Sequence, residues 1–203
     1  MAHTSYDATQ LKDLLLQMLE TELAGEQVYK KAIPVARNPD LKKEWQEYLE
    51  QTRTHYNVLL TLCEDLGLDP DGRSASRDVI RHIGKALVQS IELAASSGTA
   101  QAAELIACEC VVHAETKDHA NWELLGQVAA AASGQQAELL KNAYARVQQD
   151  EDHHLQHSKG WQRELALQGL GMPAVLPPPE EVHHGARAAD AGARAVPQRR
   201  SML

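Results

Sequence analysis

The sequence contains no phenylalanine, and aromatic residues make up only 4% of its 203 residues. β-Strands favour aromatic and β-branched side chains, so this shortage speaks against a β-rich fold. Alanine, leucine, glutamine, glutamate and lysine are abundant instead, and these residues favour helices. Composition therefore predicts an all-α protein before any pattern is considered.

Long apolar runs and an excess of basic charge are also missing. No stretch of the sequence is long and apolar enough for a transmembrane helix, so we expect no membrane partner. The first ten residues lack the basic region and apolar stretch of a secretory signal, which favours a cytoplasmic location. The formal net charge of -8 repels phosphate, so we expect no nucleic-acid partner.

Cysteine is scarce as well. Cys63, Cys108 and Cys110 are an odd number of thiols and lack the spacing of a zinc knuckle. All three fall within helical patterns, so we interpret them as small buried thiols of a reducing compartment.

Apolar residues recur at intervals of three and four, which predicts five helices. We place them at about 7–37, 38–66, 76–95, 100–132 and 135–167. Asn38 followed by Pro39 is a typical helix start, and Pro34 is expected to bend or fray the last turn of the first helix.

The helix lengths favour one particular plan. Four long helices in two hairpins, joined by a connection that holds a shorter helix, make an antiparallel bundle with one crossover, as in ferritin-like folds. We assign residues 1–168 to this bundle. Residues 169–203 contain three consecutive prolines and then an Ala/Arg/Gly-rich stretch with few apolar residues, so we predict a disordered tail.

Ionisable residues interrupt the apolar stripe of each long helix. They are Glu22, with Glu26 bordering the same face, His55, Glu115, Glu151 and His154. Antiparallel helices of one hairpin bring together residues that are equally distant from their turn. Glu115 and Glu151 each lie eighteen residues from Ser133, and Glu22 and His55 lie sixteen and seventeen residues from Asn38. At a rise of about 1.5 Å per residue, each pair meets within about 1–2 Å.

A buried cluster of carboxylates needs compensation, and a pair of divalent metal ions supplies it. The usual donor pattern in such bundles is one Glu from each of two helices and Glu-x-x-His from each of the other two. Residues 151–154 form a complete Glu-x-x-His, whereas Thr52 to His55 keep the His and lose the Glu. These residues predict a site for two Fe or Mn ions.

Plainer interpretations exist for several of these residues. The polar run 150–157 could be a solvated helix face, with His153 and His157 on its flanks. His55 could be a hydrogen-bonded core histidine, and Glu26 could pair with Lys30 at the surface. Thr52, His113 and His119 are candidates for residues that orient the ligands rather than bind the metal.

Short motifs of the first helix are similar to those of two families. Glu22-Leu23 followed by Tyr29 is similar to bacterioferritins, in which the Glu is a ligand. Gly25-Glu26-Gln27 is similar to the Gly-Glu-Ser of rubrerythrins, which favours Glu26 instead. Both alternatives stay open at this point.

A broader resemblance, over residues 10–165, is to the YciE/YciF-type ferritin-like stress proteins. It rests on three segments, Lys31-Ala32-Ile33-Pro34, Tyr48-Leu49-Glu50-Gln51-Thr52 and Val111-Val112-His113-Ala114-Glu115. The resemblance implies a non-haem iron or manganese protein of the ferritin-like superfamily with a stress-linked role. Its expected partners are oxygen, peroxide or iron, and ferritin-like bundles commonly form homodimers.

Departures from that family leave the function open. Its acidic residues on the second helix are Gln51 and Thr52 here, and Val112 stands where a glutamate would precede His113. The site would then hold two metal ions, one, or none. A di-iron oxidoreductase is the first hypothesis, and a non-catalytic scaffold with a degenerate metal site is the alternative.

Overall fold

A computed structural model describes residues 6–179. Within this part every regular element is a helix and no strand occurs, which confirms the all-α prediction. The elements are α1 (Ala8–Ala32), the 3-10 helix η1 (Ile33–Val35), α2 (Pro39–Asp65), α3 (Ala75–Ser97), α4 (Ala100–Ala131) and α5 (Gly134–Gly169). None of these helices combines the length and hydropathy needed to cross a membrane.

The helix ends follow local capping chemistry. The Asn38 side chain accepts hydrogen bonds from the backbone N–H groups of Asp40 and Leu41, and Pro39 occupies the first helical position. Pro34 lies inside η1, so the regular helix ends just before it, at Ala32. The predicted start of α2 and the predicted disturbance at Pro34 are therefore both confirmed.

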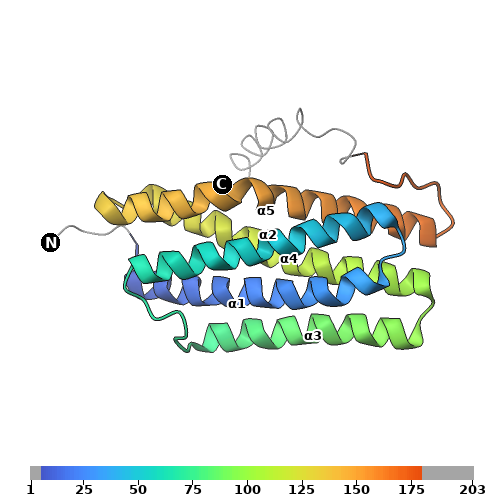
Figure 1. The fold of residues 1–203 in the computed structure, drawn as a ribbon, viewed down its shortest axis with the longest axis horizontal. Coiled ribbons are helices and arrows are strands. Elements are labelled where there is room, and N and C mark those ends of the chain that lie inside the picture. Colours follow the sequence, from blue (N-terminus) through green and yellow to red (C-terminus); the bar gives the residue numbers. More distant parts are fainter. Residues whose placement is uncertain (1–5, 180–203) are drawn as a thin grey trace, which may run out of the picture.

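The five helices lie lengthwise beside one another and are joined at the two ends of the molecule (Figure 1). Helix α1 packs against α2, α3 and α4, while α5 packs against α4 and α2. Helix α3 has 23 residues, nearly as many as the 25 of α1, and it lies along the outer side of α1 in Figure 1. The four helices α1, α2, α4 and α5 therefore enclose the space in which the candidate site lies.

The contact between α1 and α3 depends on one glycine. A Cβ atom added at Gly84 would lie 2.5 Å from the Cβ of Ala24. Helix α3 can therefore approach α1 this closely only because residue 84 has no side chain.

The apolar core consists of two clusters at different heights along the helices. The first contains Met18 and Leu19 of α1 with Trp122 of α4, and the second contains Tyr29 of α1 with Trp161 of α5. On the four helices the clusters are separated by roughly two turns, as on α4, to four turns, as on α5. Ionisable residues fill this interval, so a polar layer lies between two apolar ones.

The segment after α5 is irregular and largely exposed, and part of it contacts the bundle. Val175 donates its backbone N–H to Glu164 Oε2 at 2.8 Å, and Leu176 contacts the second apolar cluster. Gly169 itself is the last residue of α5. The remainder of the predicted tail, residues 180–203, lies outside the described residues, as do residues 1–5.

Candidate metal centre

The polar layer brings together six ionisable side chains from four helices. They are Glu22 of α1, His55 of α2, Glu115 and Asp118 of α4, and Glu151 and His154 of α5. Each of these residues is at most 5% exposed. Five of the six were predicted from the sequence, and Asp118 was not.

Five of these residues form two groups that share Glu151. Glu22, His55 and Glu151 form one group and Glu115, Glu151 and His154 the other, with the ligand atoms of each group within 4.8 Å of one another. Oε1 of Glu151 lies 3.0 Å from Nδ1 of His55 and 3.9 Å from Nδ1 of His154. A carboxylate in this position can bridge two ions.

Each imidazole of the centre contacts a hydrogen-bond acceptor through the ring nitrogen that faces away from the centre. His55 Nε2 lies 3.2 Å from Asp150 Oδ2, and His154 Nε2 lies 2.9 Å from Gln51 Oε1. An acceptor at Nε2 favours the tautomer with its proton there, which leaves the lone pair of Nδ1 directed into the centre. Histidine ligands of metals are usually oriented in this way.

Two carboxylates of the centre are likewise held by hydrogen bonds from residues around it. Trp122 donates its indole N–H to Glu22 Oε1 at 3.0 Å, and the Tyr29 hydroxyl donates to Glu115 Oε1 at 2.7 Å. The second oxygen of each carboxylate has no hydrogen-bond partner, and Glu151 has none at either oxygen. One oxygen of Glu22 and one of Glu115 therefore accept a hydrogen bond from the protein, whereas the second oxygen of each, and both oxygens of Glu151, accept none.

Unpaired polar atoms are concentrated in this one place. Nine buried side-chain N or O atoms of the described residues lack a hydrogen-bond partner, and seven of them belong to the six residues of the centre. Each such atom ordinarily costs about 1–3 kcal/mol, so proteins rarely bury several together. Every one is a carboxylate oxygen or an imidazole nitrogen, the atom types that bind divalent cations, and six of the seven belong to residues of the two groups of ligand atoms.

The raised pKa values of the buried carboxylates also favour a bound cation. Burial raises the pKa of Glu22 well above its usual range, and the neighbouring carboxylates of Asp118 and Glu151 raise it further. Burial likewise raises the pKa of Asp118 and of Glu151, with further contributions from other carboxylates of the centre. A bound cation reverses this effect, because it stabilises the ionised form of each carboxylate.

Asp118 adds a fourth carboxylate to the polar layer, although it belongs to neither of the two groups of ligand atoms. It follows Glu115 by one helical turn, so both side chains point from the same face of α4. With it the centre has four carboxylates and two imidazoles, the same donor count as the usual di-metal pattern in helical bundles. The spacing of Glu115 and Asp118 was a signal in the sequence, comparable to that of Glu151 and His154.

Glu26 lies outside the centre. Its carboxylate contacts Lys30 Nζ at 2.8 Å and Arg53 Nε at 3.0 Å, and these partners lower its pKa. Glu26 is one helical turn beyond Glu22, which rotates it toward the boundary between α1 and α2 rather than toward the α4 and α5 side. Of the two candidates on the first helix, the geometry therefore selects Glu22 and places Glu26 in a surface ion pair.

The three predicted orienting residues do not contact the ligands through hydrogen bonds. His113 is exposed. His119 pairs with Asp152, at 2.9 Å, outside the centre, because it lies one residue beyond the buried face that carries Asp118. Thr52 is buried, but it lines a surface pocket instead of holding a ligand. The orienting roles fall to other residues, which are Gln51, Asp150, Tyr29 and Trp122.

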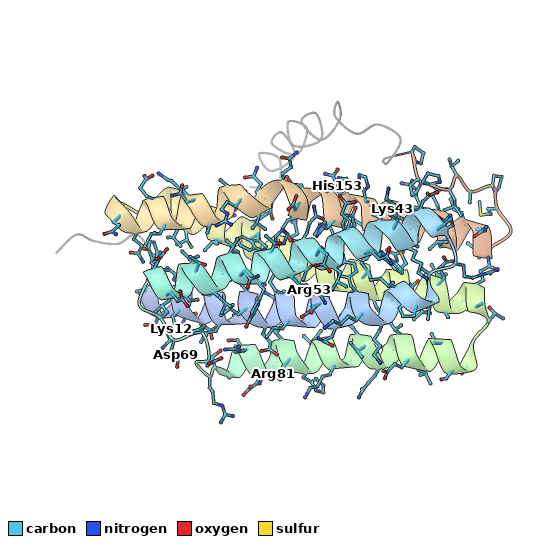
Figure 2. The ribbon with its side chains drawn as sticks, in the orientation of Figure 1. Lys12, Lys43, Arg53, Asp69, Arg81 and His153 are labelled. Carbon is cyan, nitrogen blue, oxygen red and sulfur yellow. The ribbon has the colours of Figure 1, made fainter. Side chains whose placement is uncertain are left out.

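A surface pocket between α1 and α2 borders the centre. It measures about 240 Å³ and is lined by Glu22 and Thr52 together with Glu26, Arg53 and Asn57. Arg53 lies over the boundary between α1 and α2 (Figure 2) and is bonded there to Glu26. Glu22 lines this pocket, but its side chain has no exposed surface, so the pocket borders the centre without opening into it.

Comparison with protein-family models, with curated proteins and with solved structures yields no match. The resemblance to ferritin-like proteins stays a prediction.

Proposed function

We propose that this protein is a non-haem di-metal protein that binds two Fe or Mn ions between four helices arranged as an antiparallel ferritin-like bundle. Glu22, His55 and Glu151 would hold one ion, and Glu115, Glu151 and His154 would hold the other. Asp118 would supply the remaining carboxylate. The observation that carries this proposal is the set of seven inward-facing ligand atoms without hydrogen-bond partners.

The donor set supports iron or manganese. Carboxylate and imidazole ligands suit these ions, whereas thiolates would favour zinc, copper(I) or iron–sulfur clusters. The three cysteines lie outside the centre, and burial raises the pKa of Cys63 and Cys110 to about 11. They would remain neutral thiols at physiological pH.

The expected co-reactant is a small oxidant. Bound Fe or Mn ions would supply electrons to oxygen or peroxide. The pocket of about 240 Å³ borders the centre at Glu22 and fits a molecule of that size. The two apolar clusters above and below the layer exclude water from the rest of the centre. We therefore propose oxygen or peroxide reduction, or iron oxidation, in a stress response.

In the proposed centre, Tyr29 would orient the carboxylate of Glu115. Burial, followed by the nearby Glu115, raises the pKa of its phenol well above the usual value, so the hydroxyl keeps its proton. It donates this proton in the hydrogen bond to Glu115 Oε1. This bond orients Glu115 so that its other oxygen, Oε2, faces His154 Nδ1 at 3.4 Å.

The alternative is a scaffold in which the same residues form a buried hydrogen-bond network. Exposed apolar residues on α3, Val79, Ile83 and Leu93, would then bind a partner protein. A structural network would be expected to pair its inner atoms with one another, because unpaired polar atoms destabilise the fold. The inner atoms make no hydrogen bonds with one another, although Nδ1 of His55 and Oε1 of Glu151 lie 3.0 Å apart, and this favours the metal protein.

The test is metal content of the anaerobically reconstituted protein, measured by mass spectrometry for the wild type and for Glu151→Gln. We expect two Fe(II) or Mn(II) ions bound at the centre of the wild type and loss of both in the variant, since both groups share Glu151. Peroxide consumption would be measured on the same samples. Glu138→Gln is a matched control, because Glu138 is an exposed glutamate of the same helix.

Each outcome has a consequence. Equal metal content in the wild type and Glu151→Gln would overturn the assignment of the centre. Metal loss together with absence of any oxidant consumption by the wild type would leave a metal-binding protein without the proposed redox activity. An unchanged helical circular dichroism spectrum would show that the variant is folded.

A further inference from the structure

A second group of ligating side chains lies between α2 and α5, separate from the buried centre. Glu44 of α2 and His153 and His157 of α5 bring one ligand atom each within 4.8 Å of the others. We propose that these three residues form a mononuclear site for a divalent transition-metal ion such as Zn²⁺, Co²⁺ or Fe²⁺.

The spacing of the two histidines suits joint coordination. His153 and His157 are four residues apart on α5, so their side chains lie on one face of the helix. Their rings are 3.7 Å apart between centroids and tilted by 33°. Two histidines at this spacing with a carboxylate from another element are a recurring zinc-binding arrangement, and two imidazoles with one carboxylate also bind Fe²⁺.

The carboxylate of the group is held in place by two donors. Trp161 donates its indole N–H to Glu44 Oε2 at 2.7 Å, and the hydroxyl of Tyr48 donates to Glu44 Oε1. Trp161 is only 1% exposed, so its position is set by the core. His157 Nδ1 lies 3.0 Å from the same Oε1. Such outer hydrogen bonds pre-orient a metal-binding carboxylate.

The second group shares no residue with the buried centre. Tyr48 lies between the two, since its hydroxyl contacts Glu44 and its ring lies 4.1 Å from that of His154. His153 is partly exposed and lies on α5 at the edge of the molecule in Figure 2, whereas His55 and His154 are 1% exposed. The second site would therefore exchange metal with solvent more readily than the centre does.

The experiment separates the two sites by using a chain whose buried centre is disabled. Glu151→Gln would be freed of metal and titrated with Co²⁺, following the visible absorption bands and the bound metal by mass spectrometry. We expect one Co²⁺ per chain in Glu151→Gln. Adding His153→Gln or His157→Gln should weaken this binding by more than about 100-fold, because loss of an outer hydrogen bond alone weakens it by about 10–100-fold.

A matched control uses a histidine outside both sites. His119 is a half-buried histidine paired with Asp152, so His119→Gln in the same background should leave Co²⁺ binding unchanged. In the otherwise wild-type chain, His153→Gln should lower the total bound metal by one ion. His153 is partly exposed, so this single variant provides a readout even if Glu151→Gln fails to fold.

The results separate this site from the proposed function. Co²⁺ affinity that is unchanged by both His153→Gln and His157→Gln would overturn the second site, as would a folded Glu151→Gln that binds no Co²⁺. One Co²⁺ retained in Glu151→Gln, with the wild type binding no further metal, would support the second site and contradict the di-metal centre.

Discussion

Nε2 of His154 lies 2.9 Å from Oε1 of Gln51. This contact spans α5 and α2, and it turns Nδ1 of the imidazole toward the interior of the polar layer. The predicted resemblance expects an acidic residue at position 51. The amide oxygen of Gln51 can accept the imidazole N–H as a carboxylate would, so it can orient the histidine.

The first prediction concerns this contact. Gln51→Ala should weaken Fe(II) or Mn(II) binding at the centre by about 10–100-fold, because His154 loses the acceptor that orients it. Gln51→Glu keeps an acceptor oxygen at the same reach and should bind metal within a few-fold of the wild type. Metal titration of the two variants checks this, and equal weakening in both would contradict it.

A second prediction concerns Asp118, the carboxylate that the sequence patterns did not single out. Asp118→Asn keeps the size of the side chain but removes its charge, so we expect the number of ions bound at the centre to fall from two to one. Asp118 is 5% exposed and surrounded by the carboxylates of the centre. The metal-free variant should be more stable than the metal-free wild type, since one buried acid is gone. Chemical denaturation and mass spectrometry measure both effects.

The third prediction distinguishes the two glutamates of the first helix. Glu22→Gln should abolish binding of at least one ion, because Glu22 faces His55 and Glu151. Glu26→Gln should leave the metal content unchanged and lower the free energy of unfolding by no more than about 1 kcal/mol, as for other surface ion pairs. A Glu26→Gln variant without metal would show that the geometry has selected the wrong residue.

The fourth prediction concerns pH and the metal-free protein. The pKa values of Glu22, Asp118 and Glu151 are raised in the fold, so the folded chain binds more protons than the unfolded chain above about pH 4.5. Its free energy of unfolding should therefore fall as the pH rises from about 4.5 toward neutrality. The lowered pKa of Asp150 has the opposite effect, because it makes the free energy of unfolding rise with pH. This effect falls below that pH range.

Urea denaturation at several pH values measures this slope. Glu151→Gln should have a shallower slope than the wild type, since one of the three raised groups has been removed. Saturating Mn(II) should reverse the trend, because metal binding requires ionised carboxylates. Stability of the metal-free wild type that increases from pH 4.5 to 7 would contradict the prediction.

The fifth prediction tests the contact of α3 with α1. Gly84→Ala improves helix propensity by about 1 kcal/mol, yet it should lower stability by about 1–3 kcal/mol, because the new methyl group meets Ala24. The double variant Ala24→Gly/Gly84→Ala exchanges the two residues and removes the overlap. It should recover most of the lost stability in thermal denaturation, and a failure to do so would locate the strain elsewhere.

The helices were largely predictable from the sequence because their signals are local. Asn38 and Pro39 define the start of α2, and Pro34 ends the regular part of α1. The apolar period of three and four residues identified the remaining helices within about two residues at most of their ends. These features depend on neighbours within one or two turns, which the sequence contains in full.

The composition of the polar layer was predictable in part. Glu22, His55, Glu115, Glu151 and His154 interrupt apolar stripes, and a stripe marks the buried face wherever the helix finally packs. The prediction missed Asp118, although it lies one turn from Glu115. The adjacent His119 was predicted to lie near the ligands instead, although it differs from Asp118 by one residue, or about 100° around α4.

The sequence by itself determined the helices, their buried faces and the presence of charged groups within those faces. Only the tertiary structure decided that Glu22 and not Glu26 joins the centre, that Gln51 and Asp150 orient the histidines, and that Glu44 meets His153 and His157. The physical reason is the rotation of each helix about its own axis. Each residue along a helix turns by about 100°, so small differences in how neighbouring helices are rotated decide which side chains meet.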